Sequence, residues 1–267
     1  MVEGECPIDS DPVKSSEEKA QLTYRRLALV DFPEDLRLGL NLAFYRTFGV
    51  PTIARVLVGT GKMTRSPRAR AKATGELMYT LIEHGLDSSA GRDAIVALNR
   101  LHSGLPVGEE EFVYVLAAFC VAPVRWIDRH SWRTTTAEEK NASYGFYAGL
   151  AQRMHINLLP RSYSELASWM DKFEEQHFAV TGEGQALMDA TRGLLAARFP
   201  RLVVPLVRFG ADALLDERLR AGVGAARPPA VVRGLVAAAL RIRVGKMRWR
   251  NRTAACRDAT MRVPATD

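Results

Sequence analysis

Apolar residues in this chain recur at the spacing of an α-helix through most of its length. No segment alternates apolar and polar residues in the manner of a strand. A typical run contains Leu36, Leu40 and Phe44, and it ends where Gly49 and Pro51 interrupt the pattern. Similar runs follow one another, separated by proline, glycine and helix-capping sequences. We therefore predict an all-α protein, a single large helical domain of roughly nine to eleven helices with a basic C-terminal helix.

Charge and composition divide the 267 residues into three parts. Residues 1–20 are acidic and poor in aromatic side chains, which predicts a disordered tail. Residues 21–225 contain no linker-like stretch and are predicted to form one domain. Residues 226–267 are predicted to form a basic amphipathic helix and tail. Their basic side chains follow an apolar stretch: Arg241, Arg243, Lys246, Arg248, Arg250, Arg252, Arg257 and Arg262.

The basic C-terminal segment has two interpretations. It is either a solvated helix end or a surface that meets anionic phosphate groups. Of the phosphate-bearing partners we favour the surface of a membrane, and we expect no nucleic-acid partner.

The three cysteines, Cys6, Cys120 and Cys256, are far apart and form no CxxC pair. They therefore predict neither a disulfide framework nor a zinc site. The chain also lacks a secretory signal and any apolar run of about eighteen residues. These features favour a cytoplasmic protein in a reducing compartment, with peripheral membrane association as the remaining possibility.

His102 is the histidine most open to a functional interpretation. A helix is predicted from Ser88 to just before Gly104, and Ile95, Leu98 and His102 stand at positions i, i+3 and i+7 of it. The imidazole thus shares the apolar face of this helix. Two interpretations remain open: a hydrogen-bonded core histidine, or a ligand of a transition metal or haem iron.

The preceding predicted helix begins after Ser66-Pro67, ends at Gly85, and carries Arg70 and Thr74 four residues apart on one face. Arg70 could pair with a carboxylate, such as a propionate or an acidic side chain. Thr74 could hold a small ligand or could donate to its own backbone.

The sequence gives no support for a phosphate-binding loop, a zinc or di-iron motif, or a catalytic serine. The sequence GTGK at 59–62 lacks the remaining elements of a phosphate-binding loop. No HExxH motif occurs, and ExxH does not occur as the pair that a di-iron site needs. No serine lies in a nucleophile elbow. The remaining histidines are predicted to be structural or solvated, with His130 in an exposed polar turn: His84, His130, His155 and His177.

Several blocks, in order and spacing, resemble a known family. They are LNLAFYRTFGVPTIARVL, GTGKM, ALNRLHSGL, FVYVLAAFCVAPVRWID, AEEKNASYGFYAGLAQRMHI and LPRSYSELASWMDKFEEQHF. Together they resemble the MpaB-type oxygenases, an all-helical family related to the latex-clearing (rubber) oxygenases. The similarity covers residues 32–180, and it continues more weakly to residue 250.

The resemblance implies a haem b protein that uses dioxygen. His102 matches the family's proximal iron ligand, while Arg70 and Thr74 match residues of its haem pocket and are the candidate catalytic residues. In the latex-clearing branch a distal lysine precedes the threonine, but this chain has Ala73 there. The neighbouring Lys72 would point about 100° away on a helix.

The resemblance further implies an oxidoreductase that cleaves a carbon–carbon double bond of an apolar, isoprenoid-like substrate. We expect Phe112, Leu116, Phe119 and Trp126 to line the substrate cavity. The alternative is a helical protein without enzymatic activity that binds lipid or a partner protein through its basic C-terminal end.

Overall fold

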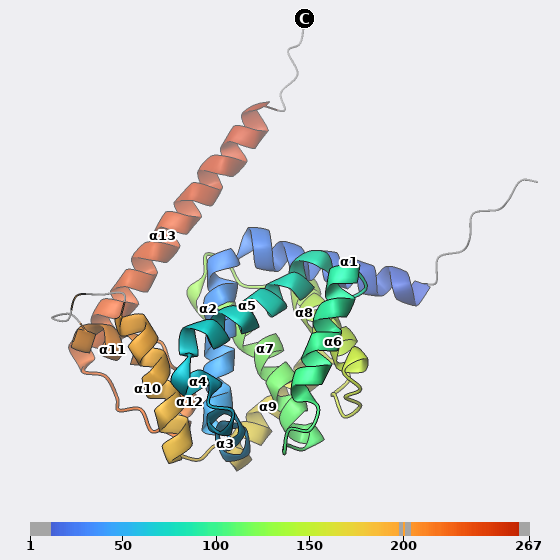
Figure 1. Ribbon diagram of the computed structural model, residues 1–267. Helices are drawn as coiled ribbons and strands as arrows, with labels where there is room; N and C mark the ends of the chain where they lie inside the picture. The colour runs from blue at the N-terminus through green and yellow to red at the C-terminus, as the bar shows by residue number, and fades with distance from the viewer. Residues whose placement is uncertain (1–11, 198–199, 201–203, 262–267) are drawn as a thin grey trace, which may run out of the picture.

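The computed structural model describes residues 12–197, 200 and 204–261. These residues form helices joined by short turns and contain no strand, which confirms the predicted all-α class (Figure 1). Eleven of the described α-helices have nine or more residues, and α4 and α12 are shorter. The elements are α1 (Pro12–Arg26), η1 (Leu27–Asp31), α2 (Pro33–Arg46), η2 (Thr47–Gly49), α3 (Pro51–Gly59), α4 (Lys62–Arg65), α5 (Pro67–His84), α6 (Ser89–His102), α7 (Glu109–His130), α8 (Ala137–Arg153), α9 (Tyr163–His177), α10 (Gly182–Ala196), α11 (Val204–Asp212), α12 (Glu217–Gly222) and α13 (Ala230–Met261).

Helices α2 and α7 pack closely along their length and form the centre of the molecule. Pro123 lies inside α7, where a proline commonly kinks or breaks a helix, yet the helix continues unbroken from Glu109 to His130. Gly39 of α2 faces the proline, and a side chain at Gly39 would overlap Pro123. The missing side chain at residue 39 therefore lets the two helices approach at the position of the proline.

Helix α1 begins inside the segment that the sequence predicts to be a disordered tail. Residues 1–11 lie outside the described residues, but Pro12 already begins the helix. Tyr24 is buried against Phe146 and Tyr147 of α8, and the Tyr24 and Tyr147 hydroxyls are hydrogen-bonded at 3.2 Å. This aromatic packing accounts for the earlier start, because a short amphipathic segment gains a buried face here.

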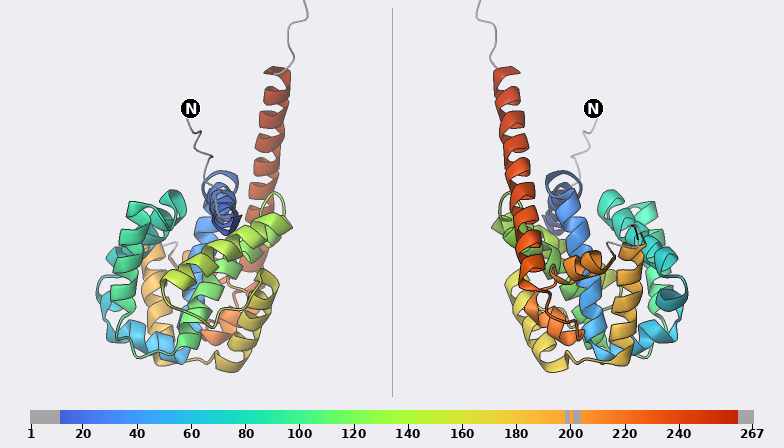
Figure 2. Two further views of the ribbon diagram at one scale, coloured as in Figure 1. Left: turned by 90° about the vertical axis from the view of Figure 1, so that its right-hand side faces the viewer. Right: turned by 90° about the vertical axis from the view of Figure 1, so that its left-hand side faces the viewer.

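The chain between the two central helices, α3 to α6, forms a separate flank. Figure 2 shows α5 and α6 on one side of α2 and α13 on the other. Within this flank Leu81, Ile82 and Ile95 are buried, whereas most residues of α5 and α6 are only partly buried or exposed. The flank therefore packs on the core along one side only.

Helix α13 is attached near its middle, and its distal half extends away from the other helices (Figure 1). Arg243 donates to the carboxylate of Asp35 at 2.6 Å, and Leu240 packs against the core. Asp35 is fully buried and also accepts hydrogen bonds from Trp126 Nε1 at 3.1 Å and Ser131 Oγ at 2.7 Å. Among the described helices none is long and apolar enough to span a bilayer.

A buried ionic cluster joins α2, α7, α9 and α12. Arg46 donates from two nitrogens to Glu174, at 2.6 and 2.7 Å, and also pairs with Asp216. Tyr114 donates its hydroxyl to Glu174 at 3.1 Å. Glu174 has no exposed side-chain surface, so these contacts replace the water that its charge would otherwise need.

Candidate functional site

Helices α3 to α6, the first half of α7 and part of α8 enclose a mainly apolar cavity of about 290 Å³, which we call the first cavity. The wall is built mostly from leucine, isoleucine, valine, methionine and phenylalanine side chains. Ser88 caps α6 by accepting from the Gly91 backbone N–H at 2.8 Å, and Pro67 begins α5. These signals, which were readable in the sequence, fix where both helices begin and so which residues face the cavity.

His102, the last residue of α6, reaches into the first cavity and lies 5.3 Å from Phe112, measured between ring centroids. Its Nδ1 is buried and has no hydrogen-bond partner among the described residues. Burial lowers the pKa of His102, and the nearby charge of Arg70 lowers it further. The imidazole is therefore neutral at pH 7, the form that binds a metal.

Arg70 and Thr74 of α5 line the same cavity, so the structure brings together the three residues predicted from the sequence. Burial alone lowers the pKa of Arg70, and its guanidinium forms no ion pair with any described residue. Thr74 Oγ1 donates to the Arg70 carbonyl at 2.9 Å, the backbone bond that was one of its two predicted alternatives. Arg70 is thus a partly buried cation without a counter-charge.

Two further polar residues line this cavity that the sequence did not single out. Lys62, from the GTGK segment, forms no ion pair with the described residues. Its position depends on Gly61, whose left-handed backbone (φ 66°) turns the chain into α4. Glu111 accepts hydrogen bonds from Thr52 Oγ1 and the Gly108 backbone N–H, both at 3.0 Å. Only the motif GTGK could have marked Lys62, and nothing in the sequence favoured a site there, because the other elements of a phosphate-binding loop are missing.

The remaining polar groups of the wall are satisfied within the protein. Thr47 and Thr60 donate to backbone carbonyls, at 2.6 and 2.8 Å, and Tyr147 bonds with Tyr24. Among the described residues of this wall, the unpartnered polar side chains are therefore one neutral imidazole and two cations, His102, Arg70 and Lys62.

This donor set fits haem better than a metal ion bound by protein alone. Within the described residues no group of three or more His, Cys, Asp or Glu side chains could hold a metal. A haem iron needs only one or two protein ligands, because the porphyrin supplies four nitrogens. The buried, unpartnered imidazole suits the iron, and the unpaired Arg70 and Lys62 suit the two propionates.

Four side chains of α7 were predicted to line the cavity. Phe112, Leu116 and Phe119 line the first cavity as expected, but Trp126 does not. Trp126 lies two helical turns beyond Phe119 and faces a different cavity, with its Nε1 donating to Asp35. The prediction for His130 is also wrong: it ends α7, is half-buried, and packs against Trp126 at 4.2 Å between ring centroids.

A comparison with known protein families matches most of the chain, including the residues that line the first cavity. Residues 38–243 match the family model described as "ER-bound oxygenase mpaB/B'/Rubber oxygenase, catalytic domain". The chain belongs to this family. The predicted resemblance is thereby confirmed, and the enzyme class expected from the sequence, an oxidoreductase of the oxygenase type, is the class of the family.

Curated relatives in this family are distant in sequence. The chain is 24% identical over 232 residues to "ER-bound oxygenase mpaB'" of Penicillium brevicompactum, an alignment that covers 80% of this chain and 55% of the relative. It is 23% identical to "ER-bound oxygenase mpaB" of Penicillium roqueforti (strain FM164), covering 80% of this chain and 78% of that protein. The chain thus spans about half the length of the first of these relatives.

Proposed function

We propose that this protein is a haem b-dependent oxygenase that uses dioxygen to cleave a carbon–carbon double bond of an apolar, isoprenoid-like substrate. The observation that carries the proposal is the first cavity itself. In it His102 and Arg70 face a mainly apolar space from adjacent helices, and neither side chain has a hydrogen-bond or ionic partner among the described residues. Membership of a family of oxygenase catalytic domains supports the same assignment.

The residues of the cavity have distinct roles in this proposal. His102 binds the iron through a neutral imidazole, and Arg70, with Lys62, pairs with the propionates. Thr74 lies one turn from Arg70 and is assigned to contact dioxygen or substrate, while Ala73 lines the same wall and offers only a methyl group. The distal lysine of the latex-clearing branch is therefore absent from this position, which favours a substrate other than rubber.

The chemistry depends on a dry cavity. Bound haem supplies the activation of dioxygen, and the protein supplies orientation and the exclusion of water. Phe112, Leu116 and Phe119 present apolar surface to the substrate. Cleavage of one double bond by one dioxygen molecule gives two carbonyl groups, so carbonyl products are the chemical signature of the reaction.

The visible spectrum of protein purified after haem-supplemented expression tests the cofactor. Wild-type protein is expected to show a Soret band, and His102→Ala to lose it while the helical circular dichroism persists. His84→Ala is a matched control, because His84 is exposed at the end of the neighbouring helix α5. Haem retained by His102→Ala at wild-type stoichiometry, with an unchanged Soret band, would falsify the assignment.

The substrate class needs a separate measurement. Aerobic incubation with a panel of unsaturated terpenoids, followed by derivatisation of carbonyl products, is expected to give cleavage with the wild type and none with His102→Ala. Saturated analogues serve as the control. A haem-loaded protein that yields no carbonyl product from any unsaturated compound would leave the cofactor assignment standing and refute the reaction.

The location of the protein is proposed on separate grounds. We propose that it works in a reducing, cytoplasmic environment and contacts an anionic membrane through α13. Exposed apolar residues of this helix, Val231, Leu235, Ile242 and Trp249, alternate with basic residues. If no Soret band forms, the alternative becomes the better one: a non-enzymatic helical protein that binds lipid or a partner through this helix.

A further inference from the structure

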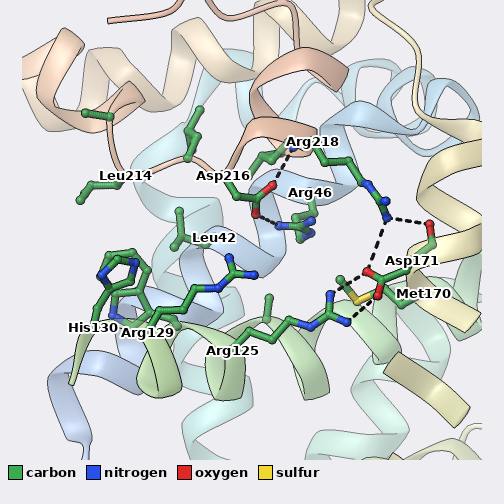
Figure 3. A pocket seen from close by; sticks show the side chains of 15 residues that line it. Leu42, Arg46, Arg125, Arg129, His130, Met170, Asp171, Leu214, Asp216 and Arg218 are labelled. Carbon is green, nitrogen blue, oxygen red and sulfur yellow. Dashed lines mark hydrogen bonds and ion pairs between the residues drawn. The ribbon is translucent and has the colours of Figure 1, made fainter. Parts of the chain in front are cut away.

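A second cavity, of about 530 Å³, lies beside the central helix pair and is lined by other residues than the first (Figure 3). The second half of α7 lines it, together with α2, α9, α12 and the turn before α12. No residue lines both this second cavity and the first. Ligand-binding cavities in proteins are commonly about 300–1,000 Å³, so this one has the size of a ligand site.

Two arginines of the second cavity are already paired. Arg125 forms a two-pronged ion pair with Asp171, with both N–O distances at 2.7 Å. Arg46 pairs with Glu174 and Asp216, as described above. Both guanidiniums are thus held in place by carboxylates.

The other two arginines keep donors free. One terminal nitrogen of Arg218 donates to the Asp171 carbonyl at 2.8 Å and forms longer ion pairs with Asp171 at 3.5 Å and Glu174 at 4.0 Å, while its other nitrogens have no carboxylate partner among the described residues. Arg129 forms no hydrogen bond or ion pair with any described side chain. In Figure 3 its guanidinium points toward the space between Arg46 and Arg125. Arg129 is exposed, and its charge lowers the pKa of Asp216, a carboxylate that Arg46 already pairs. Arg129 therefore faces the cavity without a direct ionic partner of its own.

The charges around the second cavity do not cancel. Four guanidiniums meet three carboxylates, which leaves one excess positive charge. His130 does not add to it, because burial and the nearby Arg129 lower the pKa of its imidazole. The residues counted are Arg46, Arg125, Arg129 and Arg218 against Asp171, Glu174 and Asp216.

The second cavity has both polar and apolar lining residues. Figure 3 shows Arg218, Asp171 and Arg125 at one end, while Leu42 and Leu214 lie toward the other, on the same side as Arg129. Trp126 also lines the cavity and is buried. A ligand whose charged head pairs with Arg129 would therefore have apolar surface next to that head.

We propose that the second cavity binds an organic monoanion, a carboxylate with an apolar body, whose head pairs with Arg129. A single negative charge balances the single excess positive charge, whereas a phosphate dianion would leave a net negative charge. Arg129 and Arg218 have donors available for the head group, and a guanidinium matches a carboxylate in a paired geometry. This inference is independent of the haem assignment, because it uses none of the residues of the first cavity.

Isothermal titration of the full chain with decanoate tests the site. Decanoate is expected to bind the wild type, and Arg129→Gln to weaken binding at least tenfold because a charge-assisted contact is lost. Arg129→Lys is expected to recover part of the affinity, since it keeps the positive charge but lacks the paired N–H donors of a guanidinium. Leu214→Trp, which fills the apolar end, is expected to weaken binding as well.

Control variants distinguish binding in the second cavity from binding elsewhere on the protein. Arg25→Gln removes an exposed arginine of α1 that has no partner among the described residues, and Arg70→Gln removes the cation of the first cavity. Both are expected to bind decanoate as the wild type does. 1-Decanol and inorganic phosphate are expected to bind at least tenfold more weakly, and decyl phosphate no more tightly than decanoate.

Three results would overturn the proposal. Unchanged affinity in Arg129→Gln would remove the head-group contact. Loss of binding in Arg70→Gln but not in Arg129→Gln would place the ligand in the first cavity. Inorganic phosphate or 1-decanol binding as tightly as decanoate would mean that the cavity recognises a bare ion or a bare chain rather than an amphiphilic carboxylate.

Discussion

Arg46, which is buried, and Arg70, which is partly buried, stand in opposite electrostatic situations. Burial disfavours the charge of Arg46, but hydrogen bonds and the charge of Glu174 outweigh it and raise the pKa of Arg46. Arg70 has only the burial, which lowers its pKa. A buried charge that the protein itself neutralises becomes costly to the fold when its partner is removed, whereas a charge left open is available to a ligand.

This contrast predicts an effect on cofactor retention. Arg70→Ala is expected to release haem faster than Lys72→Ala, because Lys72 is exposed and pairs with Glu76 on the outer face of α5. Transfer of haem to an apo-globin acceptor, followed by absorbance, measures the two rates. Equal rates for the two variants would show that Arg70 does not hold a propionate.

Glu174 carries a prediction about stability. Glu174→Gln is expected to destabilise the fold by about 3 kcal/mol, because it leaves Arg46 buried with one fewer counter-charge. Glu175→Gln, at the exposed neighbouring position on α9, is expected to change the free energy of unfolding by less than about 0.5 kcal/mol. Urea unfolding of both variants, followed by circular dichroism, compares them, and similar midpoints would contradict the expectation.

For individual residues, the sequence allowed part of the first cavity to be predicted. Helical spacing put Arg70, Thr74 and His102 on defined faces of two helices adjacent in the chain but left their role open, and the family resemblance singled them out as site residues. The second cavity was not accessible, since Arg46, Arg129 and Arg218 come from three distant helices. Only the tertiary packing brings them together.

Among the helices, α13 has one face that contacts the domain and another that is exposed. Its inward residues, Leu240 and Arg243, contact the domain, while Ile242 and Trp249 are exposed. The sequence predicted one apolar side for this helix. The structure divides it between the core and the surface, because a single helix packed on one side buries only the residues of that face.

Arg243 is expected to be the main anchor of α13. Arg243→Ala removes a hydrogen bond to the fully buried Asp35 and is expected to cost about 2 kcal/mol in docking. Limited proteolysis is then expected to cleave α13 faster than in Arg241→Ala, which removes an exposed neighbour. Identical cleavage of the two variants would show that the helix is held by its apolar contacts alone.

The exposed face of α13, with its basic and apolar side chains, predicts membrane binding that depends on salt. Each basic residue near an anionic bilayer contributes about 1 kcal/mol at low ionic strength, and salt screens the attraction. Co-sedimentation with anionic vesicles is expected to exceed that with neutral vesicles, and to fall in the double variant Ile242→Ser, Trp249→Ser. Binding indifferent to lipid charge and salt would exclude this role.

At the scale of the whole molecule, carboxylates paired with arginines set the response to acid. The hydrogen bond from Arg125 lowers the pKa of Asp171, and Arg46 lowers that of Asp216 against the opposing effect of burial. Because the folded-state pKa values lie below the unfolded ones, these pairs contribute stability above about pH 4 and lose it as the pH falls further.

The thermal midpoint is therefore expected to change little between about pH 5 and pH 4.5 on account of these pairs and to fall steadily between about pH 4 and pH 2.5. Arg125→Met is expected to flatten that fall, since Asp171 then loses its partner. Melting curves followed by circular dichroism at each pH measure the effect, and an identical acid profile in the variant would assign it to other groups.

The α3–α6 flank follows α2 and precedes α7 in the chain, and its one-sided packing has a consequence for local unfolding. The flank contributes Arg70, Thr74 and His102 to the first cavity, yet it packs on the core along one side. It can thus open as a unit at a smaller free-energy cost than global unfolding, leaving α2 and α7 paired. A ligand bound in the cavity raises that cost through its own affinity. If the cavity holds the proposed cofactor, amide exchange in α5 and α6 is expected to slow on its binding while exchange in α7 stays the same, and the cofactor would then complete the folding of the part of the chain that holds it.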